Sequence, residues 1–171
     1  MDPFEALGTE PIFDLDLASL EQRHRDLSRA LHPDRHATSG AGERRMALGR
    51  AIEVNEAFRT LKDPVRRAEA LLARRGVQSG EGKEPPASPA LLMEVMERRE
   101  ALADLRRSKD EAALLRQISE VHAEEVRTQA ALAEAFAAES ADPTEILKRI
   151  GELRYYRRFL EEASAIADDL L

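Results

Sequence analysis

Apolar residues recur every three or four positions over long stretches of this chain, as they do along one face of an α-helix. In the first half, this spacing predicts a helix from Leu17 to about Leu31, with Asp16 as its N-cap. A longer helix is predicted from about Glu43 to Leu61. The apolar faces expected are Leu20, Leu27 and Leu31 in the former, and Leu48, Ile52, Phe58 and Leu61 in the latter. Packed face to face, the two helices would form an antiparallel hairpin.

Two shorter helices are predicted on either side of this hairpin. One spans Pro3 to Leu7. The other opens at Asp63 and Pro64, which suit the N-cap and first helical position, and ends near Gly76. Four helices are therefore expected before residue 76.

The second half carries three long helical patterns, which begin at Ser88, near Asp110 and at Asp142. Asp142 and Glu145 have the spacing of a capping box. One predicted apolar seam consists of Leu114, Ile118, Val121 and Leu132, and another of Ile146, Ile150, Leu153, Leu160 and Ala167. Three long helices with short joints predict a bundle.

Glycine and proline interrupt every periodic pattern between the two halves, which predicts an irregular connection. The residues concerned are Gly76, Gly80, Gly82, Pro85, Pro86 and Pro89. We therefore expect a first module at 1–75, a linker at 76–88 and a three-helix bundle at 89–171. The predicted fold class is all-α.

Composition supports a helical fold and excludes several kinds of chemistry. The chain has 171 residues, of which 43% are hydrophobic and only 4% aromatic, and it contains no tryptophan. Such a composition is typical of helical bundles. Because there is no cysteine, a disulfide, a thiolate nucleophile and a cysteine-ligated zinc or iron–sulfur centre are all excluded.

The net charge of −7 arises mainly after residue 75, since acidic and basic side chains balance before it. An acidic chain without a basic stripe repels phosphates, so nucleic-acid binding is not expected. The segment from Met1 to Leu15 has no basic residue, and no apolar run approaches the roughly 20 residues of a membrane span. We expect a cytoplasmic protein that does not associate with membranes.

The tripeptide His32-Pro33-Asp34 follows the first long helix directly. Proline stops a helix and disfavours helical geometry in the residue before it, so the tripeptide is predicted to lie in a turn. On a helical wheel, Arg25, Arg29 and His32 fall in a narrow sector opposite the apolar face, and should face solvent together. A simple helix stop with a polar face is the alternative interpretation.

The order of these elements resembles the J domain over roughly residues 1–75. The tripeptide lies between a basic helix and its antiparallel partner, with one short helix before and another after. The resemblance implies that His32, Pro33 and Asp34, with Arg25 and Arg29, dock on a DnaK-class chaperone and accelerate its ATP hydrolysis.

A finer resemblance, to the HscB family of iron–sulfur J proteins, extends along nearly the whole chain. The segments that carry it are Asp2-Pro3-Phe4, Val54-Asn55-Glu56-Ala57-Phe58-Arg59-Thr60-Leu61, Arg67-Ala68-Glu69, Leu71-Leu72 and Leu92-Met93-Glu94-Val95-Met96-Glu97-Arg98-Arg99-Glu100. The last is the most specific, because it lies beyond the J domain. The chain begins directly at the J domain, which favours a bacterial-type member.

The helix that begins at Ser88 is predicted to have two different faces. Leu91, Val95 and Leu102 form one, and the opposite one carries carboxylates edged by methionine and leucine. Methionine suits an adaptable protein interface. The family resemblance implies that this face binds an IscU-type scaffold and that the chaperone partner is of the HscA class. The residues carried over are Leu92, Met93, Met96, Glu97, Glu100, Asp104 and Tyr155.

Three positions depart from the family pattern. His24 stands where an aromatic residue is usual, Ala70 replaces a usual tyrosine, and Asp26 lies beside the basic helix surface. Such changes are expected to affect packing or chaperone affinity, not the kind of function.

The sequence offers two candidate metal sites. His32, Asp34 and His36 alternate like nitrogen and oxygen ligands, but close sequence neighbours rarely converge on one ion. The carboxylates Glu94, Glu97 and Glu100 suggest a di-iron bundle, yet such a site needs inward-facing ligands from several helices. We therefore expect no metal and no resident cofactor.

No nucleophile elbow or phosphate-binding glycine loop occurs in the sequence, so no catalytic residues are predicted. We expect an activator of a partner's ATPase and not an enzyme. The alternative is a generic J protein whose second module binds another client or dimerises.

Overall fold

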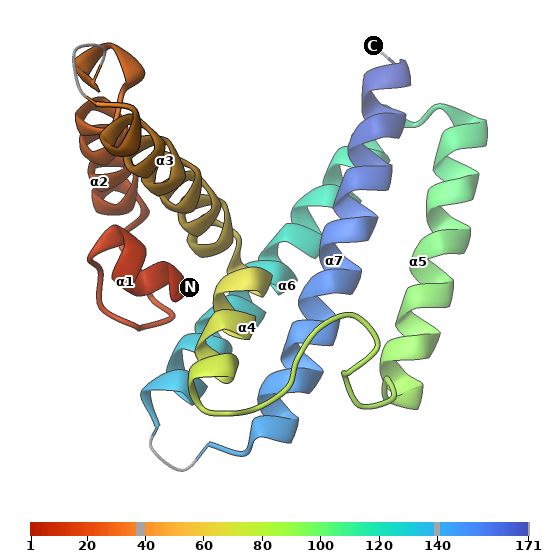
Figure 1. The fold of residues 1–171 in the computed structure, drawn as a ribbon. Coiled ribbons are helices and arrows are strands. Elements are labelled where there is room, and N and C mark those ends of the chain that lie inside the picture. The colour runs from red at the N-terminus through yellow and green to blue at the C-terminus, as the bar shows by residue number, and fades with distance from the viewer. Residues whose placement is uncertain (37–39, 139–140, 171) are drawn as a thin grey trace. The chain divides into compact units, whose positions relative to one another are not determined.

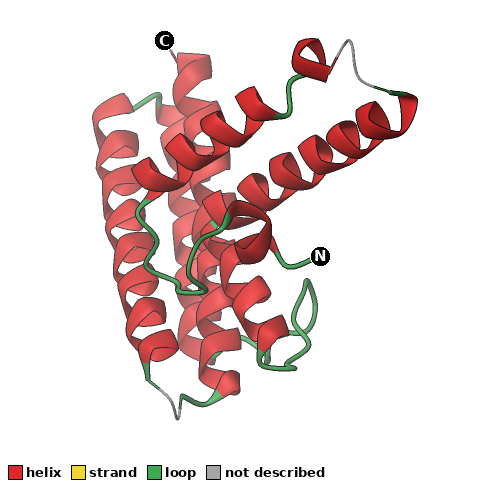
Figure 2. Ribbon diagram, turned by 60° about the vertical axis from the view of Figure 1, so that its left-hand side comes forward, coloured by secondary structure: helices red, strands yellow, loops and turns green. Residues whose placement is uncertain are grey.

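The structure is a computed structural model that describes residues 1–36, 40–138 and 141–170; the side chains of His36 and Leu170 are not described. Within these ranges the regular structure is helical, without a strand (Figures 1 and 2). The all-α class predicted from the sequence is thereby confirmed. The chain divides into two compact units, Met1–Val77 and Gln78–Leu171.

The described residues of the first unit form α1 (Pro3–Leu7), α2 (Leu17–Ala30), the 3₁₀-helix η1 (Pro33–His36), α3 (Ala41–Lys62) and α4 (Pro64–Arg74). Three of these helices, α1, α2 and α4, have an aspartate as N-cap, which the sequence predicted for α2 and α4. Asp2 accepts from the Phe4 amide at 2.9 Å and Asp16 from the Ala18 amide at 3.0 Å. Asp63 accepts from the Val65 and Arg66 amides. Each carboxylate satisfies amides that lack a partner within the helix.

The core of the first unit lies where α3 packs against α1 and α2. Its buried apolar residues are Phe4, Leu7, Phe13, Leu20, Ala47, Val54, Ala57, Leu61, Val65, Ala68, Leu71 and Leu72. The predicted face of α3 was wrong at Leu48 and Ile52, which are 57% and 62% exposed. The inward face instead uses the small side chains of Ala47 and Ala57. A core face predicted from large apolar residues alone is therefore displaced around the axis of α3 from the face that is buried.

Arg67 of α4 is a buried charge within this core. Its Nη1 donates to the Leu61 carbonyl at 2.9 Å, and its guanidinium lies 4.7 Å from the centre of the Phe13 ring. Burial lowers the pKa of Arg67, while the carboxylates of Asp14 and Asp63 act in the opposite direction. The side chain ties the start of α4 to the end of α3 and to the loop before α2.

The second unit is a bundle of α5 (Pro89–Ser108), α6 (Glu111–Ala137) and α7 (Pro143–Leu170) (Figure 1). Ser88 caps α5 by accepting from the Leu91 amide, and Asp110 caps α6 by accepting from the Ala113 amide. At α7, Asp142 accepts from the Thr144 amide at 2.8 Å. The three predicted helix starts are confirmed. The Glu145 side chain, however, forms an ion pair with Lys148 and lies along α7. It therefore does not reach back to the N-cap, as the predicted capping box requires.

The predicted seams account for about half of the bundle core. Leu114, Val121 and Leu132 of α6 are buried, as are Ile146, Ile150 and Leu153 of α7, while Ile118, Leu160 and Ala167 are half-buried. The later part of α7 buries Tyr156, Phe159, Ala163 and Ile166 instead. The seam follows these residues because they continue the spacing of three and four from Leu153 without a break.

Candidate functional site

His32 follows α2, and Pro33 and Asp34 open the short helix η1, with the polar side chains of His32 and Asp34 in solvent. The side chain of His32 is 57% exposed and that of Asp34 is 91% exposed. The Asp34 amide donates to His32 Nδ1 at 3.3 Å, and the Arg35 amide donates to the His32 carbonyl at 3.0 Å. The predicted turn is confirmed, and the Asp34 carboxylate, although 3.5 Å from His32 Nδ1, is exposed enough to meet a partner.

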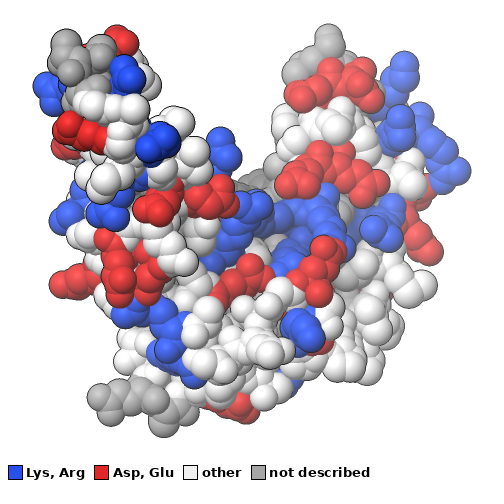
Figure 3. Space-filling model, viewed as in Figure 1, with Lys and Arg blue, Asp and Glu red and all other residues white. Residues whose placement is uncertain are grey.

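Arg25 and Arg29 lie on the exposed face of α2 that leads to this turn. Arg25 donates to Gln22 at 2.7 Å and lies 3.9 Å from the Glu21 carboxylate. Arg29 lies 3.9 Å from Asp26, which is one of the departures from the family pattern. Because such exposed pairs are worth less than about 1 kcal/mol, the guanidinium groups remain available. Acidic and basic side chains are interspersed over α2 and α3 on the face drawn in Figure 3.

His24 replaces the usual aromatic residue by stacking as an aromatic ring itself. Its imidazole lies 4.1 Å from the Phe58 ring at an interplanar angle of 11°. Nε2 is 2.8 Å from Asn55 Oδ1. His24 therefore supplies a ring contact between α2 and α3.

The predicted division of α5 into two faces is confirmed by burial. Leu102 is buried and Leu91 and Val95 are half-buried, whereas Met93 and Met96 are more than 60% exposed. The outer face, which we call the Met-carboxylate stripe, consists of Leu92, Met93, Met96, Glu97, Glu100 and Asp104. Six of the seven residues predicted to bind a scaffold therefore share one exposed surface.

Tyr155 of α7, the seventh, lies apart from the stripe on the inner side of α5. Its ring is 5.4 Å from that of Tyr156 and 6.5 Å from that of Phe159. The hydroxyl is buried without a hydrogen-bond partner in the described part of the chain. Burial, the largest effect, raises the pKa of Tyr155. Tyr155 thus belongs to the wall of the bundle core and not to the stripe.

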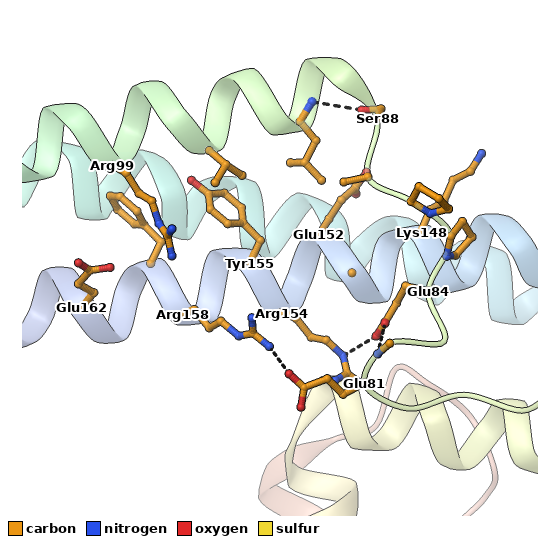
Figure 4. A pocket seen from close by; sticks show the side chains of 18 residues that line it. Glu81, Glu84, Ser88, Arg99, Lys148, Glu152, Arg154, Tyr155, Arg158 and Glu162 are labelled. Atoms are coloured by element: carbon orange, nitrogen blue, oxygen red, sulfur yellow. Dashed lines mark hydrogen bonds and ion pairs between the residues drawn. The ribbon is translucent and has the colours of Figure 1, made fainter.

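A groove of about 470 Å³ opens beside Tyr155, and the sequence did not predict it. We call residues 80–88, which form one wall, the strap. The Glu84 carboxylate lies 2.8 Å from Arg154 Nε, and the Glu81 carboxylate 2.7 Å from Arg158 (Figure 4). The other lining side chains come from α5 and α7 and include Leu91, Val95, Arg99, Lys148, Glu152, Tyr155, Phe159 and Glu162. The sequence does hold a signal for this groove, namely opposite charges. The strap carries acidic residues, and α7 carries Arg154 and Arg158.

The predicted metal alternatives find no support among the described side chains. No group of three or more histidine, aspartate or glutamate residues in that part of the chain is placed to hold an ion. The side chain of His36 lies outside the described residues. Glu94 pairs with Arg98 at 2.9 Å on α5. Among the described helices, none is long and apolar enough to cross a membrane.

The fold and the exposed tripeptide define the class of this protein: a J-domain co-chaperone with an additional three-helix bundle. A family model described as the HSCB C-terminal oligomerisation domain matches residues 87–164. A co-chaperone protein HscB homolog from Shewanella oneidensis is 34% identical over 173 residues, which cover 100% of this chain and 99% of the relative. A homolog from Shewanella sp. strain ANA-3 is 43% identical over 64% of this chain and 63% of its own.

Solved structures agree with the sequence relatives. Chaperone HscB from Vibrio cholerae matches with a TM-score of 0.85 and 34% identity, covering 100% of both chains. Human co-chaperone protein HscB matches with a TM-score of 0.85 and 26% identity, covering 96% of this chain and 81% of its own. The chain belongs to the HscB family of co-chaperones.

Proposed function

We propose that this protein stimulates the ATPase of a DnaK-class chaperone of the HscA type and delivers an IscU-type iron–sulfur scaffold to it for cluster transfer. The observation that carries the proposal is the presence, in one chain, of an exposed His-Pro-Asp turn on a basic helix and an exposed Met-carboxylate stripe on a separate unit. The cluster is cargo of the scaffold and not a resident group of this chain.

The chaperone contact uses the turn and the basic face of α2. Arg25 and Arg29 attract an acidic surface of the chaperone, since both are more than half exposed. The Asp34 carboxylate, 91% exposed, accepts a charge-assisted hydrogen bond from a chaperone cation. Tighter binding of this face to one chaperone state biases the chaperone towards ATP hydrolysis and firm client binding.

The scaffold contact uses the Met-carboxylate stripe. Three exposed apolar side chains, Leu92, Met93 and Met96, supply burial on binding. Glu97, Glu100 and Asp104 select a basic partner surface. Because methionine repacks easily, the stripe can adapt to the client surface.

The two contacts act together because both lie on one chain. A scaffold held on the bundle has a raised effective concentration at a chaperone held by the J domain. The opposite charges of the two surfaces keep each partner on its own site, since a basic client is repelled by Arg25 and Arg29. The result expected is synergistic stimulation of hydrolysis.

The test is steady-state ATP hydrolysis by the cognate HscA-type chaperone, with this protein and the IscU-type scaffold added singly and together. Wild-type protein should stimulate, and more so with scaffold present. His32→Gln should abolish stimulation while calorimetry still detects scaffold binding. Stimulation that does not depend on the scaffold would mean that the bundle binds another client. No stimulation in any combination would refute the proposal.

Self-association is a second candidate role for the bundle, favoured by the description of the family model as an oligomerisation domain. Leu115 and Val126 of α6 are each about half exposed, and lie three turns apart on that helix. Sedimentation velocity across a concentration series distinguishes the two roles, because a pure client-binding bundle stays monomeric at every concentration.

A further inference from the structure

The strap is fixed to α7 by contacts that keep the groove open. The carboxylate of Glu84 and the guanidinium of Arg154 are only 14% and 19% exposed, so their ion pair is shielded from water. Glu84 Oε2 also accepts from the Gly82 amide at 3.0 Å. Figure 4 shows both strap carboxylates directed at α7, away from the space beside Tyr155.

The outer wall of the groove is stiff. Pro85, Pro86 and Ala87 follow Glu84 and line the groove before Ser88 caps α5. Proline restricts the backbone, and Ser88 fixes the end of the segment. A partner side chain that enters the groove therefore meets a surface that is already ordered, which lowers the entropic cost of binding.

The groove and the Met-carboxylate stripe form one continuous surface on α5. Leu91 and Val95 line the groove. Leu92 and Met96 of the stripe each follow one of them directly, about 100° further around the helix. A protein bound to the stripe therefore reaches the groove across two exposed apolar side chains.

We propose that the strap groove receives an apolar side chain of the scaffold bound to the stripe, so that residues 80–88 are part of the client-binding surface. The inference rests on the proposed function and extends it to a segment outside the helices. The volume lies within the range of ordinary ligand pockets, about 300–1000 Å³, and accommodates a large aliphatic or aromatic side chain.

The chemistry of the occupant follows from the surroundings. Leu91, Val95 and Phe159 offer an apolar lining, while the stripe beside them is acidic. The matching client segment places an apolar residue next to basic ones. Tyr155 also lines the groove, although its hydroxyl is buried in the bundle, so the entering side chain meets the aromatic ring.

The test is a substitution in the strap that fills the groove and leaves the bundle core unchanged. Ala87 is exposed and lines the groove, so Ala87→Trp adds a ring there. Ala112→Trp on α6 is the matched control, because Ala112 is also exposed and lines no part of the groove. Calorimetry with the IscU-type scaffold should give about tenfold weaker binding for Ala87→Trp and wild-type affinity for the control.

Reversal of Glu97 and Glu100 to lysine separates this inference from the proposed function. If the reversal weakens binding and Ala87→Trp binds like the control, the groove inference is wrong and the proposed function stands. If wild-type protein does not bind the scaffold, the proposed function itself fails. Weakening by both changes, with the control unaffected, supports the groove.

Fluorine NMR of 3-fluorotyrosine-labelled protein gives a direct readout, since the chain has only two tyrosines. Tyr155→Phe assigns the two signals. Scaffold should shift or broaden the Tyr155 signal in wild-type and Ala112→Trp proteins. An unchanged Tyr155 signal in a saturated wild-type complex would overturn the inference.

Discussion

At the scale of single residues, two of the three departures from the family pattern, His24 and Asp26, have physical explanations, and Ala70 has none in the structure. His24 makes a stacked ring contact with Phe58 and a polar contact with Asn55. Asp26 pairs with Arg29 on the same turn of α2. Both changes leave Arg25, Arg29 and His32 exposed, so we expect chaperone affinity to be adjusted and not lost.

Tyr156 gives a prediction about stability at alkaline pH. Burial, followed by the nearby carboxylates Glu94 and Glu152, raises the pKa of Tyr156 to about 12 from an ordinary 10.0. Between these values the unfolded chain loses a proton that the folded one retains, so the free energy of unfolding falls as pH rises. Wild-type protein should lose about 2 kcal/mol more than Tyr156→Phe between about pH 10 and 12.

Urea unfolding at a series of pH values measures this difference. Tyr156→Phe keeps the ring in the core, and comparison with it cancels the titration of other groups. Parallel stability curves for the two proteins would show that Tyr156 ionises as easily in the folded chain as in the unfolded one.

At the scale of elements, the strap packs against the long helix α7 at Gly151. Its missing side chain faces the Glu84 side chain, and a Cβ built there would lie 3.5 Å from Glu84 Cγ, an ordinary contact. Gly151→Ala should therefore be tolerated and should stabilise α7 by about 0.5–1 kcal/mol, since glycine weakens a helix interior.

Thermal or urea unfolding checks this prediction, with Gly151→Leu as the contrasting variant. The larger side chain must displace Glu84, so that variant should lose the benefit and expose strap amides to hydrogen exchange. Destabilisation by Gly151→Ala would mean that the strap packs closer to α7 than 3.5 Å.

Features of the elements that depend on neighbouring residues could be predicted from the sequence, and features that depend on distant residues could not. Capping aspartates such as Asp16 and Asp63 act locally, so helix starts could be predicted from a few neighbouring residues. Leu48 and Ile52 were misplaced because two of the four buried positions of α3 are alanines, Ala47 and Ala57, which carry little pattern signal. The strap groove depends on pairs such as Glu84 with Arg154, whose partners are distant in sequence.

The same distinction applies to the candidate site. The stripe was predictable because six of its residues follow one helical face. Tyr155 came only from the family resemblance, and its position beside the groove depends on how α5 packs against α7. Arg67 was recognised only as part of a family motif, since nothing in its sequence neighbourhood signals a buried guanidinium.

At the scale of the whole molecule, the proposal requires the two surfaces to act from one chain. Each unit has its own buried core, around Leu61 and Leu72 in the first and Leu114 and Leu153 in the second. A surface change in one unit should therefore leave the other folded. What the covalent connection adds is proximity, which raises the effective concentration of the scaffold at the chaperone by orders of magnitude.

A mixing experiment tests this requirement. One variant carries His32→Gln, and the other carries Glu97→Lys with Glu100→Lys, so each retains a single functional surface. If both surfaces must belong to one chain, an equimolar mixture should fail to restore scaffold-dependent stimulation of the chaperone ATPase, although circular dichroism shows both variants folded. Restoration that grows with protein concentration would instead place the two surfaces on different subunits of an oligomer, because only subunit exchange brings an intact turn and an intact stripe together.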